Sequence, residues 1–509
     1  MSITNRALRR LASGAGALAL GLAGIAALGT AASADVGPDQ PDAPAEGSLT
    51  IYKYAGDTGQ AVEDLDQADL LNGVQFTVTR VGRLVGEEAS QTCEPIDLTE
   101  AEDWVGLSGD SGLFSTAPEE PAGDFCLTAT VYTEATVGGA AIFDPLPVGI
   151  YYVEETDPGD NPIVSPVPNF YVSIPTSNEG EDAGWNYDVV VYPKNQIMEG
   201  PSKAIAEGQE DLVVGGEVTW TITVPIPSLN NEDTFTTASV SDTLDSRLTY
   251  ASSTVTVGGA TLVENTDYTV STTGGVTTWT FTPVTSGDGV VNIPSLYGAQ
   301  GTNITIELVT SVDSIGDGTI PNDEYSSTFN DATVPGEPTP YTYWGQLSIL
   351  KTDDSEPALN LEGAEFQVFE LTDASCPPEA PETGAIATGT SNASGVVEWD
   401  EVANATVLGL WVANVNNGPA APTPTKDYCV YETVIPSGHT ATAISNPVTI
   451  EPGEVKQGTF TLTVVNPRTD GPDLPLTGAG GTLAMTLGGL LLVGVGAGAI
   501  VISRRRHEA

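Results

Sequence analysis

The sequence predicts an all-β protein made of three tandem β-sandwich domains, and two patterns support this prediction. Runs such as 218–224, 276–282 and 302–308 alternate β-branched or apolar residues with polar ones, between clusters of Gly, Pro and Asn. This period-two alternation is typical of strands with one buried face. Three sequence blocks also recur in the same order near the two ends of the chain, which indicates two homologous domains on either side of a different one.

The repeat defines the domain organisation. The matching blocks are Gly47–Lys53 with Gly345–Lys351, Leu71–Val78 with Leu361–Val368, and Tyr151–Thr156 with Tyr428–Thr433. Pro-containing junctions near 198–202 and 336–345 then place immunoglobulin-like domains at 35–198, 199–343 and 344–470. We expect a signal peptide at 1–34 and a sorting segment at 471–509 to flank them.

The chain is strongly acidic, which limits its function. It has 509 residues, with 68 Asp and Glu against 16 Lys and Arg, and a net charge of −52. A nucleic-acid-binding function is excluded because it needs a basic surface, and an apolar share of 40% argues against a disordered acidic chain. With only two histidines, His-based catalysis is not expected. The acidic stretches 230–233 and 313–317 lack EF-hand spacing, so we expect no metal and no cofactor.

The N-terminal residues have the pattern of a secretory signal peptide. Three arginines within 6–10 precede an apolar run at 11–28 and an Ala-Ser-Ala sequence at 32–34. A basic start, an apolar centre and a small-residue cleavage site predict a secreted protein that begins at Asp35. A retained membrane helix is the alternative.

The C-terminal residues form a three-part pattern. It consists of Leu474-Pro475-Leu476-Thr477-Gly478, an apolar stretch at 480–502 that is long enough to span a bilayer, and three arginines at 504–506. Together these parts resemble the cell-wall sorting signal of Gram-positive surface proteins. The resemblance implies that a sortase cleaves between Thr477 and Gly478, holds Thr477 as a thioester and attaches the chain to the cell wall. A linker before an ordinary membrane anchor is the alternative.

Four cysteines fit an oxidising compartment. The pairs Cys93–Cys126 and Cys376–Cys429 each lie within one third of the chain, so they are favoured among the three possible connectivities. Metal ligation is the weaker interpretation because no CxxC spacing occurs.

Lysine is scarce, and three of the six lysines open a domain. The repeated domains share a Lys, a Glu and an Asn: Lys53, Glu155 and Asn195 in the first, and Lys351, Glu432 and Asn466 in the last. Apolar burial lowers the pKa of an amine and raises that of a carboxylic acid. A neutral amine can then attack the amide carbon while the acid polarises the carbonyl, and ammonia leaves. An ordinary buried Lys–Glu ion pair is the alternative.

The residues around Glu432 resemble a motif of a known protein family. Residues 428–438 read YCVYETVIPSG, which resembles the E-box of Gram-positive pilins. Lys351, Glu432 and Asn466 resemble the triad of their Cna B-type immunoglobulin-like domains, which implies an intramolecular Lys351–Asn466 isopeptide bond. In the first domain the Pro-x-Gly pattern downstream of Glu155 is broken. A Lys53–Asn195 bond therefore stays open.

The middle domain resembles the Cna A-like domain of major pilins, in which Asp replaces Glu. Val240–Asp245 matches its motif, so the resemblance implies Asp242 as the acid and Lys203 as the amine. Asn330 is the preferred acceptor, and Asn322 is the alternative.

Residues 185–194 read WNYDVVVYPK and fit the pilin motif WxxxVxVYPK at every specified position. The resemblance implies that a class C sortase joins Thr477 of one subunit to Lys194 of the next, giving a covalent head-to-tail homopolymer. Because neighbouring strand residues face opposite ways, an inward Asn195 predicts an outward, accessible Lys194. An edge-strand lysine beside a protective Pro193 is the alternative.

We therefore predict the major subunit of a sortase-assembled fimbria for adhesion, and not a turnover enzyme. The implied partners are class C and housekeeping sortases, identical subunits, tip and base pilins, and peptidoglycan, with host receptors left open. A minor or basal pilin, or a monomeric wall-anchored adhesin, is the first alternative. A secreted wall-bound hydrolase is the second, although neither GxSxG nor HExxH occurs.

Overall fold

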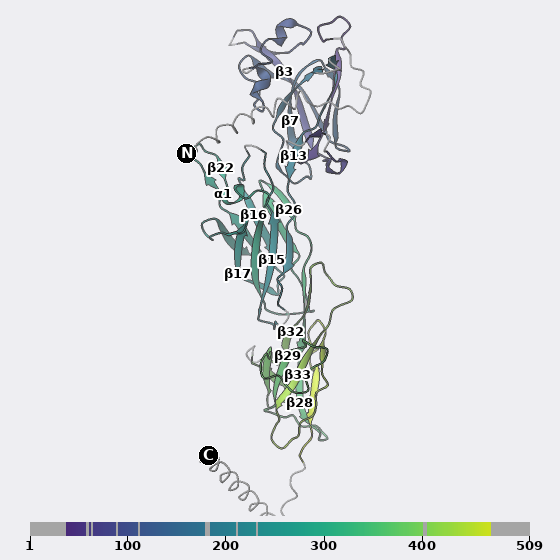
Figure 1. Ribbon diagram of the computed structural model, residues 1–509, viewed down its shortest axis with the longest axis vertical. Helices are drawn as coiled ribbons and strands as arrows, with labels where there is room; N and C mark the ends of the chain where they lie inside the picture. Colours follow the sequence, from purple (N-terminus) through teal and green to yellow (C-terminus); the bar gives the residue numbers. More distant parts are fainter. Residues whose placement is uncertain are drawn as a thin grey trace, which may run out of the picture.

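The structure is a computed structural model that describes residues 37–469, apart from 57–60, 63–64, 88–89, 110–111, 179–183, 210–211, 231–232 and 401–404. Three β-rich modules follow one another along the long axis of the molecule (Figure 1). The predicted all-β, immunoglobulin-like class is confirmed. In the described residues, helical structure is sparse and includes α1 (Pro294–Tyr297) and the 3₁₀ segments η2 (Gln67–Asp69), η3 (Ala101–Trp104) and η4 (Leu113–Thr116).

The first module is built around two main sheets. Its strands are β1 (Glu46–Tyr52), β2 (Tyr54–Ala55), β3 (Gln75–Val85), β4 (Thr92–Pro95), β5 (Phe125–Ala135), β6 (Ala140–Pro147), β7 (Gly149–Asp157), β8 (Ile163–Ser165), β9 (Phe170–Ile174), β10 (Thr176–Asn178), β11 (Gly184–Asn186), β12 (Asp188–Val191) and β13 (Lys194–Ile197). The sheet β4-β3-β7-β9, with β5 also on β3, packs against β12-β1-β6. A smaller sheet, β2-β13-β8, brings the end of the module beside its start.

The middle module is a sandwich of two five-stranded sheets. Its strands are β14 (Ser202–Ile205), β15 (Glu217–Pro225), β16 (Ala238–Thr243), β17 (Leu248–Val257), β18 (Ala260–Thr261), β19 (Tyr268–Thr273), β20 (Val276–Phe281), β21 (Val284–Thr285), β22 (Val291–Asn292), β23 (Asn303–Val312), β24 (Thr319–Pro321), β25 (Glu324–Phe329) and β26 (Ala332–Pro335). The sheet orders are β14-β15-β23-β17-β18 and β19-β20-β16-β25-β26. On β15, Val218, Trp220 and Ile222 are fully buried at every second position. Burial of each such side chain contributes roughly 1.5–3 kcal/mol.

The third module repeats the pattern of the first. Its strands are β27 (Tyr341–Leu347), β28 (Ile349–Asp353), β29 (Glu365–Glu370), β30 (Ala387–Ser391), β31 (Val397–Trp399), β32 (Leu408–Val415), β33 (Lys426–Val434), β34 (Val448–Ile450) and β35 (Leu462–Asn466). Its main sheet has the order β31-β30-β29-β33-β34, and the opening strand β28 pairs in parallel with the last strand β35. The module therefore begins and ends on adjacent strands.

The middle and third modules share a sheet. Strand β27 pairs with β24 of the middle module on one edge and with β32 of the third on the other. The rings of Trp344 and Trp411 meet edge to face at 5.3 Å and belong to the buried core of the middle module. Strand β27 thus runs across the predicted boundary at 343.

The first and middle modules meet through both apolar and polar contacts. Val164 and Met198 are buried in the core of the middle module. The Asn230 side-chain amide donates to the Pro166 carbonyl at 2.8 Å, and its backbone N–H donates to the Ser165 hydroxyl at 2.9 Å. These contacts fix the segment at β8 against the middle module.

Both predicted disulfides are confirmed. Cys93 pairs with Cys126, and Cys376 pairs with Cys429. The first joins β4 to β5, and the second ties the loop after β29 to β33. The pairing is local because both cysteines of each pair belong to the same module, whose fold brings their sulfur atoms together.

The predicted signal peptide and sorting segment lie outside the described residues. Within the described part of the chain, no helix is both long and apolar enough to cross a bilayer. The predicted domain limits remain predictions, and the strands nearest the first limit are β13, which ends at Ile197, and β14, which begins at Ser202.

Candidate functional site: three buried lysine clusters

Each module holds a lysine that is fully or almost fully buried beside an acid. Lys53 follows β1, Lys203 lies on β14 and Lys351 lies on β28, so each belongs to the opening strands of its module. Removing an ammonium group from water costs several kcal/mol. The groups that surround each lysine therefore determine its protonation and chemistry.

In the first module the structure brings all three predicted residues together. The Lys53 Nζ lies 2.8 Å from Glu155 Oε2 and donates a short hydrogen bond to Asn195 Oδ1. Asn195 Nδ2 donates to Glu155 Oε1 at 2.6 Å, which closes the triangle. The Asn195 Oδ1 also accepts from the Val167 backbone N–H at 2.7 Å, so the amide carbonyl is held toward the lysine.

Burial dominates the protonation of this cluster. Desolvation lowers the pKa of Lys53 from 10.5 to about 8, although the Glu155 charge acts in the opposite direction. The unfolded chain therefore binds more protons than the folded chain between these two values, and the free energy of unfolding rises with pH across that window.

We expect this pH dependence to be measurable in an Asn195→Ala variant, which cannot form an isopeptide bond to Lys53. Its thermal midpoint should rise between about pH 8 and pH 10 relative to that of a Lys53→Met/Asn195→Ala variant. Differential scanning calorimetry of both variants isolates Lys53, since all other titrating groups are common to the pair. Parallel curves would show that Lys53 titrates normally.

In the middle module Lys203 and Asp242 form a fully buried pair. The Lys203 Nζ lies 2.6 Å from Asp242 Oδ2 and donates to the backbone carbonyl of Asn322 at 3.1 Å. Desolvation lowers the pKa of Lys203 and raises the pKa of Asp242. The Asn322 side chain is fully buried beside Asp242, and its amide atoms lack a well-aligned hydrogen-bond partner within the described residues.

The preferred acceptor Asn330 does not lie at this site. Asp242 is opposite Tyr325 in the β16–β25 pairing, so Asn330 lies about five residues, or roughly 16 Å, farther along the strand direction. It has a positive φ of 44° at the turn after β25, where its side-chain oxygen accepts from the Thr236 backbone N–H at 2.8 Å and its Nδ2 donates to the Thr234 carbonyl at 2.8 Å. Asn322, the alternative acceptor, is the asparagine beside Lys203.

In the third module the same three residue types converge with a looser geometry. The Lys351 Nζ lies 3.8 Å from Glu432 Oε1 and donates to the carbonyls of Thr352 and Val464, each at 3.2 Å. The Asn466 Nδ2 donates to Glu432 Oε1 at 2.8 Å, and its buried Oδ1 has no hydrogen-bond partner in the described chain. Burial lowers the pKa of Lys351 and raises that of Glu432.

Lys194 is buried, so the prediction of an outward, accessible side chain is wrong. Only 3% of its surface is exposed, and its Nζ donates to the Tyr192 carbonyl at 3.4 Å. The alternation that places Lys194 opposite Asn195 holds, but β13 is the central strand of β2-β13-β8 and both of its faces are covered. Burial lowers the pKa of Lys194. No ion pair to this lysine is found in the described residues.

A polar contact near the third cluster had no motif to reveal it. Asp353 and Arg468 form an ion pair, with Arg468 Nη2 2.6 Å from Asp353 Oδ2. Asp353 lies two positions after Lys351, and Arg468 lies two positions after Asn466. This shared spacing is the sequence signal that could have revealed the contact.

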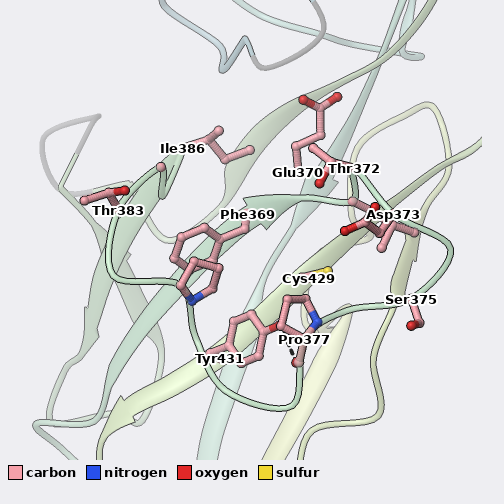
Figure 2. Close-up of a pocket in the computed structure, with 13 residues that line it drawn as sticks. Phe369, Glu370, Thr372, Asp373, Ser375, Pro377, Thr383, Ile386, Cys429 and Tyr431 are labelled. Carbon is pink, nitrogen blue, oxygen red and sulfur yellow. Dashed lines mark hydrogen bonds between the residues drawn. The ribbon is translucent and has the colours of Figure 1, made fainter.

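The third module also has a pocket that contains none of the three clusters. Its volume is about 330 Å³. Figure 2 shows the rings of Phe369 and Tyr431 beside Cys429, with Glu370 and Asp373 at the other side. The Tyr431 hydroxyl already donates to the Pro377 carbonyl at 2.7 Å.

The fold and these clusters define an elongated protein of immunoglobulin-like modules, each with a buried lysine, and comparison with known proteins identifies its family. Residues 42–196 match the N-terminal D1 domain of Gram-positive pilin subunits, residues 198–313 match the Sgo0707 N2 domain, and residues 466–509 match the LPXTG cell wall anchor motif.

Two relatives span nearly the whole chain. The fimbrial subunit type 2 of Actinomyces naeslundii is 30% identical over 98% of this chain and 97% of its own length. The fimbrial subunit type 1 of Actinomyces viscosus is 30% identical over 95% of each chain. The full-length major pilin SpaD of Corynebacterium diphtheriae, at 26% identity, covers 83% of this chain and 97% of its own with a TM-score of 0.54.

The chain therefore belongs to the fimbrial subunits, the pilins of Gram-positive bacteria. Its anchor motif and relatives make it a subunit of a surface fimbria that is anchored to the cell wall. This family is one of structural proteins.

Proposed function

We propose that the chain is the shaft subunit of its fimbria, polymerised head to tail by a sortase that joins Thr477 of one subunit to Lys194 of the next. The pilin motif at 185–194 and the sorting pentapeptide at 474–478 support the two ends of this reaction. A class C sortase would act in polymerisation, and a housekeeping sortase would transfer the finished fibre to peptidoglycan. The subunit itself performs no turnover.

Three intramolecular isopeptide bonds would then reinforce each subunit, at Lys53–Asn195, Lys203–Asn322 and Lys351–Asn466. The observation that carries this proposal is the convergence of a buried amine, a carboxyl group and a carboxamide in every module. The neutral amine attacks the amide carbon, the protonated acid polarises the carbonyl and passes on the proton, and ammonia leaves. The low-polarity surroundings favour the neutral forms of both partners.

The proposed Lys351–Asn466 bond lies where it can bear a pulling force along the fibre. In the third module β28 and β35 are parallel neighbours, with Lys351 opposite Val464. A covalent link between the first and last strands carries a pulling load directly, so the hydrogen bonds of the sheets do not have to bear it.

The burial of Lys194 adds a requirement to polymerisation. Its Nζ must become accessible before a thioester at Thr477 can be attacked. The rings of Tyr52 and Tyr192 stack at 5.7 Å beside this segment. Displacement of the Tyr192–Lys194 segment when the sortase binds would break the hydrogen bond from Lys194 Nζ to the Tyr192 carbonyl and expose the amine.

Intact-mass measurement tests the intramolecular bonds. The mature chain 35–477 should weigh three ammonias less than its sequence requires, after allowance for two disulfides. We expect Asn322→Ala to restore one ammonia, because it removes an acceptor. Asn330→Ala is the matched control and should keep all three losses. A full sequence mass for the wild type would contradict the proposal, and a mass gain only in Asn330→Ala would contradict the choice of acceptor.

A further inference from the structure

The acceptor residue of the third module lies at the end of its strand. Asn466 is the last residue of β35, which pairs with the strand β28 that carries Lys351. In the first module, by contrast, the chain continues from Asn195 to Met198, which is buried in the core of the middle module. Among the described residues, the end of β35 is instead held by contacts within the third module itself.

Asp353 and Arg468 provide a contact at the required place. The parallel pairing of β28 and β35 sets Asp353 opposite Asn466. The Arg468 Nε donates to Asp353 Oδ2 at 2.7 Å, and Nη2 lies 2.6 Å from the same oxygen. The Arg468 backbone N–H also donates to the Asp354 carboxylate at 3.2 Å. The end of β35 is thus held to the strand that carries Lys351.

The carboxylate is rigidly placed before it meets the arginine. The Asp353 side chain is 1% exposed, and its Oδ1 accepts from the backbone N–H groups of Ser355 and Leu359 at 3.1 and 2.7 Å. The Ser355 hydroxyl donates to the same atom at 2.5 Å. With Oδ1 fully engaged, Oδ2 is left for Arg468. A charge-assisted contact to a fixed carboxylate sets geometry more firmly than one between two mobile side chains.

We propose that Asp353 and Arg468 are positioning residues that hold β35 in register while the Lys351–Asn466 bond forms. A slip of one residue would turn the Asn466 side chain to the other face of the strand. In the bond-forming step, Lys351 Nζ bonds to Asn466 Cγ, the Cγ–Nδ2 bond breaks, and ammonia leaves with a proton relayed by Glu432. Asp353 and Arg468 exchange no atom. This inference rests on the proposed isopeptide chemistry.

The first module offers an internal comparison. The residues two positions after its lysine and its asparagine are Ala55 and Ile197, which cannot form an ion pair. Its cluster is nevertheless closed, with Lys53 in contact with both Glu155 and Asn195. The first module therefore closes its cluster without a charged contact at these positions, and its last strand leads directly to Met198 in the core of the middle module.

Bond formation during synthesis tests the proposal. The full chain is made in an oxidising cell-free extract with mild detergent, acid-quenched at intervals and digested, and the cross-linked peptide that contains Lys351 and Asn466 is quantified by mass spectrometry. Arg468→Ala should slow its appearance about fivefold. Arg468→Lys should restore part of the rate, because it keeps the charge but not the paired donors. Lys426→Ala is the matched control, since Lys426 pairs with Glu370 at 2.6 Å in the same module.

The cross-linked peptide of Lys203 and Asn322 in the same samples reports whether each variant folds. A slowed third bond with an unchanged middle bond, and recovery in Arg468→Lys, supports the positioning role. An unchanged rate in Arg468→Ala overturns it while the isopeptide chemistry stands. If the wild type forms no third cross-link at all, the proposed chemistry fails and the positioning role falls with it.

Discussion

Replacement of Lys194 by alanine is expected to abolish the covalent ladder of fimbrial polymers. Each linkage uses one Nζ from this position, so no second site can replace it within the proposed joint. Cell walls released enzymatically, boiled in detergent and probed on a denaturing gel should show a ladder in the wild type and single-subunit species in Lys194→Ala. The loss should be complete, because chain growth needs a nucleophile on every subunit.

Lys456→Ala is the control for this experiment. Lys456 lies in the third module outside the pilin motif, and its loss should leave the ladder intact. A persistent ladder in Lys194→Ala would assign the nucleophile elsewhere. A single wall-linked species in the wild type would show that the chain is anchored as a monomer, which is the behaviour of a surface adhesin.

Replacement of Glu432 by alanine is expected to have the largest effect on stability. It removes the acid that contacts Asn466 and faces Lys351, so the third bond should not form and the mass should rise by one retained ammonia beyond the side-chain change. A link that closes a loop of about a hundred residues stabilises by roughly 4–5 kcal/mol. The variant also leaves Lys351 buried without its acid. We expect the thermal midpoint of the third module to fall by at least about 10 °C.

Glu370→Ala provides the comparison in calorimetry and mass. Glu370 forms an ion pair with Lys426 at the start of β33, far along the strand from Glu432, and 30% of its side chain is exposed. Partly exposed pairs contribute about 1 kcal/mol or less. Equal destabilisation in both variants, or an unchanged mass in Glu432→Ala, would remove Glu432 from the chemistry.

The sequence predicts the strands well because their signal is local. The alternation at 218–224 lies within β15, whose buried and partly exposed residues alternate along its length. The two disulfides follow from the closeness of each cysteine pair along the chain, and the approach of Lys53 to Glu155 and Asn195 follows from the repeat, since homologous blocks fold alike. These features depend on neighbours in sequence or on a pattern that occurs twice.

Features that depend on the third dimension were less predictable. The alternation rule gives the face on which Lys194 lies, but it cannot show that β2 and β8 flank the strand and that the face is covered. The choice between Asn322 and Asn330 needs the register of β16 against β25. Strand β27 lies in one sheet with strands from both sides of the boundary that the repeat and the Pro-containing junction predict at 343.

The shared strand β27 also bears on how a fibre bends. Flexing between the middle and third modules would have to break the pairing of β27 with β24 and pull Trp344 and Trp411 out of the core of the middle module. Among the described strands the first and middle modules share no strand pairing, and they meet through Val164 and Met198 in the core of the middle module and through hydrogen bonds around Ser165 and Asn230. Flexural rigidity would therefore vary along each subunit, with a stiff two-module rod and a more compliant joint. Under fluid drag, curvature would concentrate once per subunit, at the same repeat as the covalent joints.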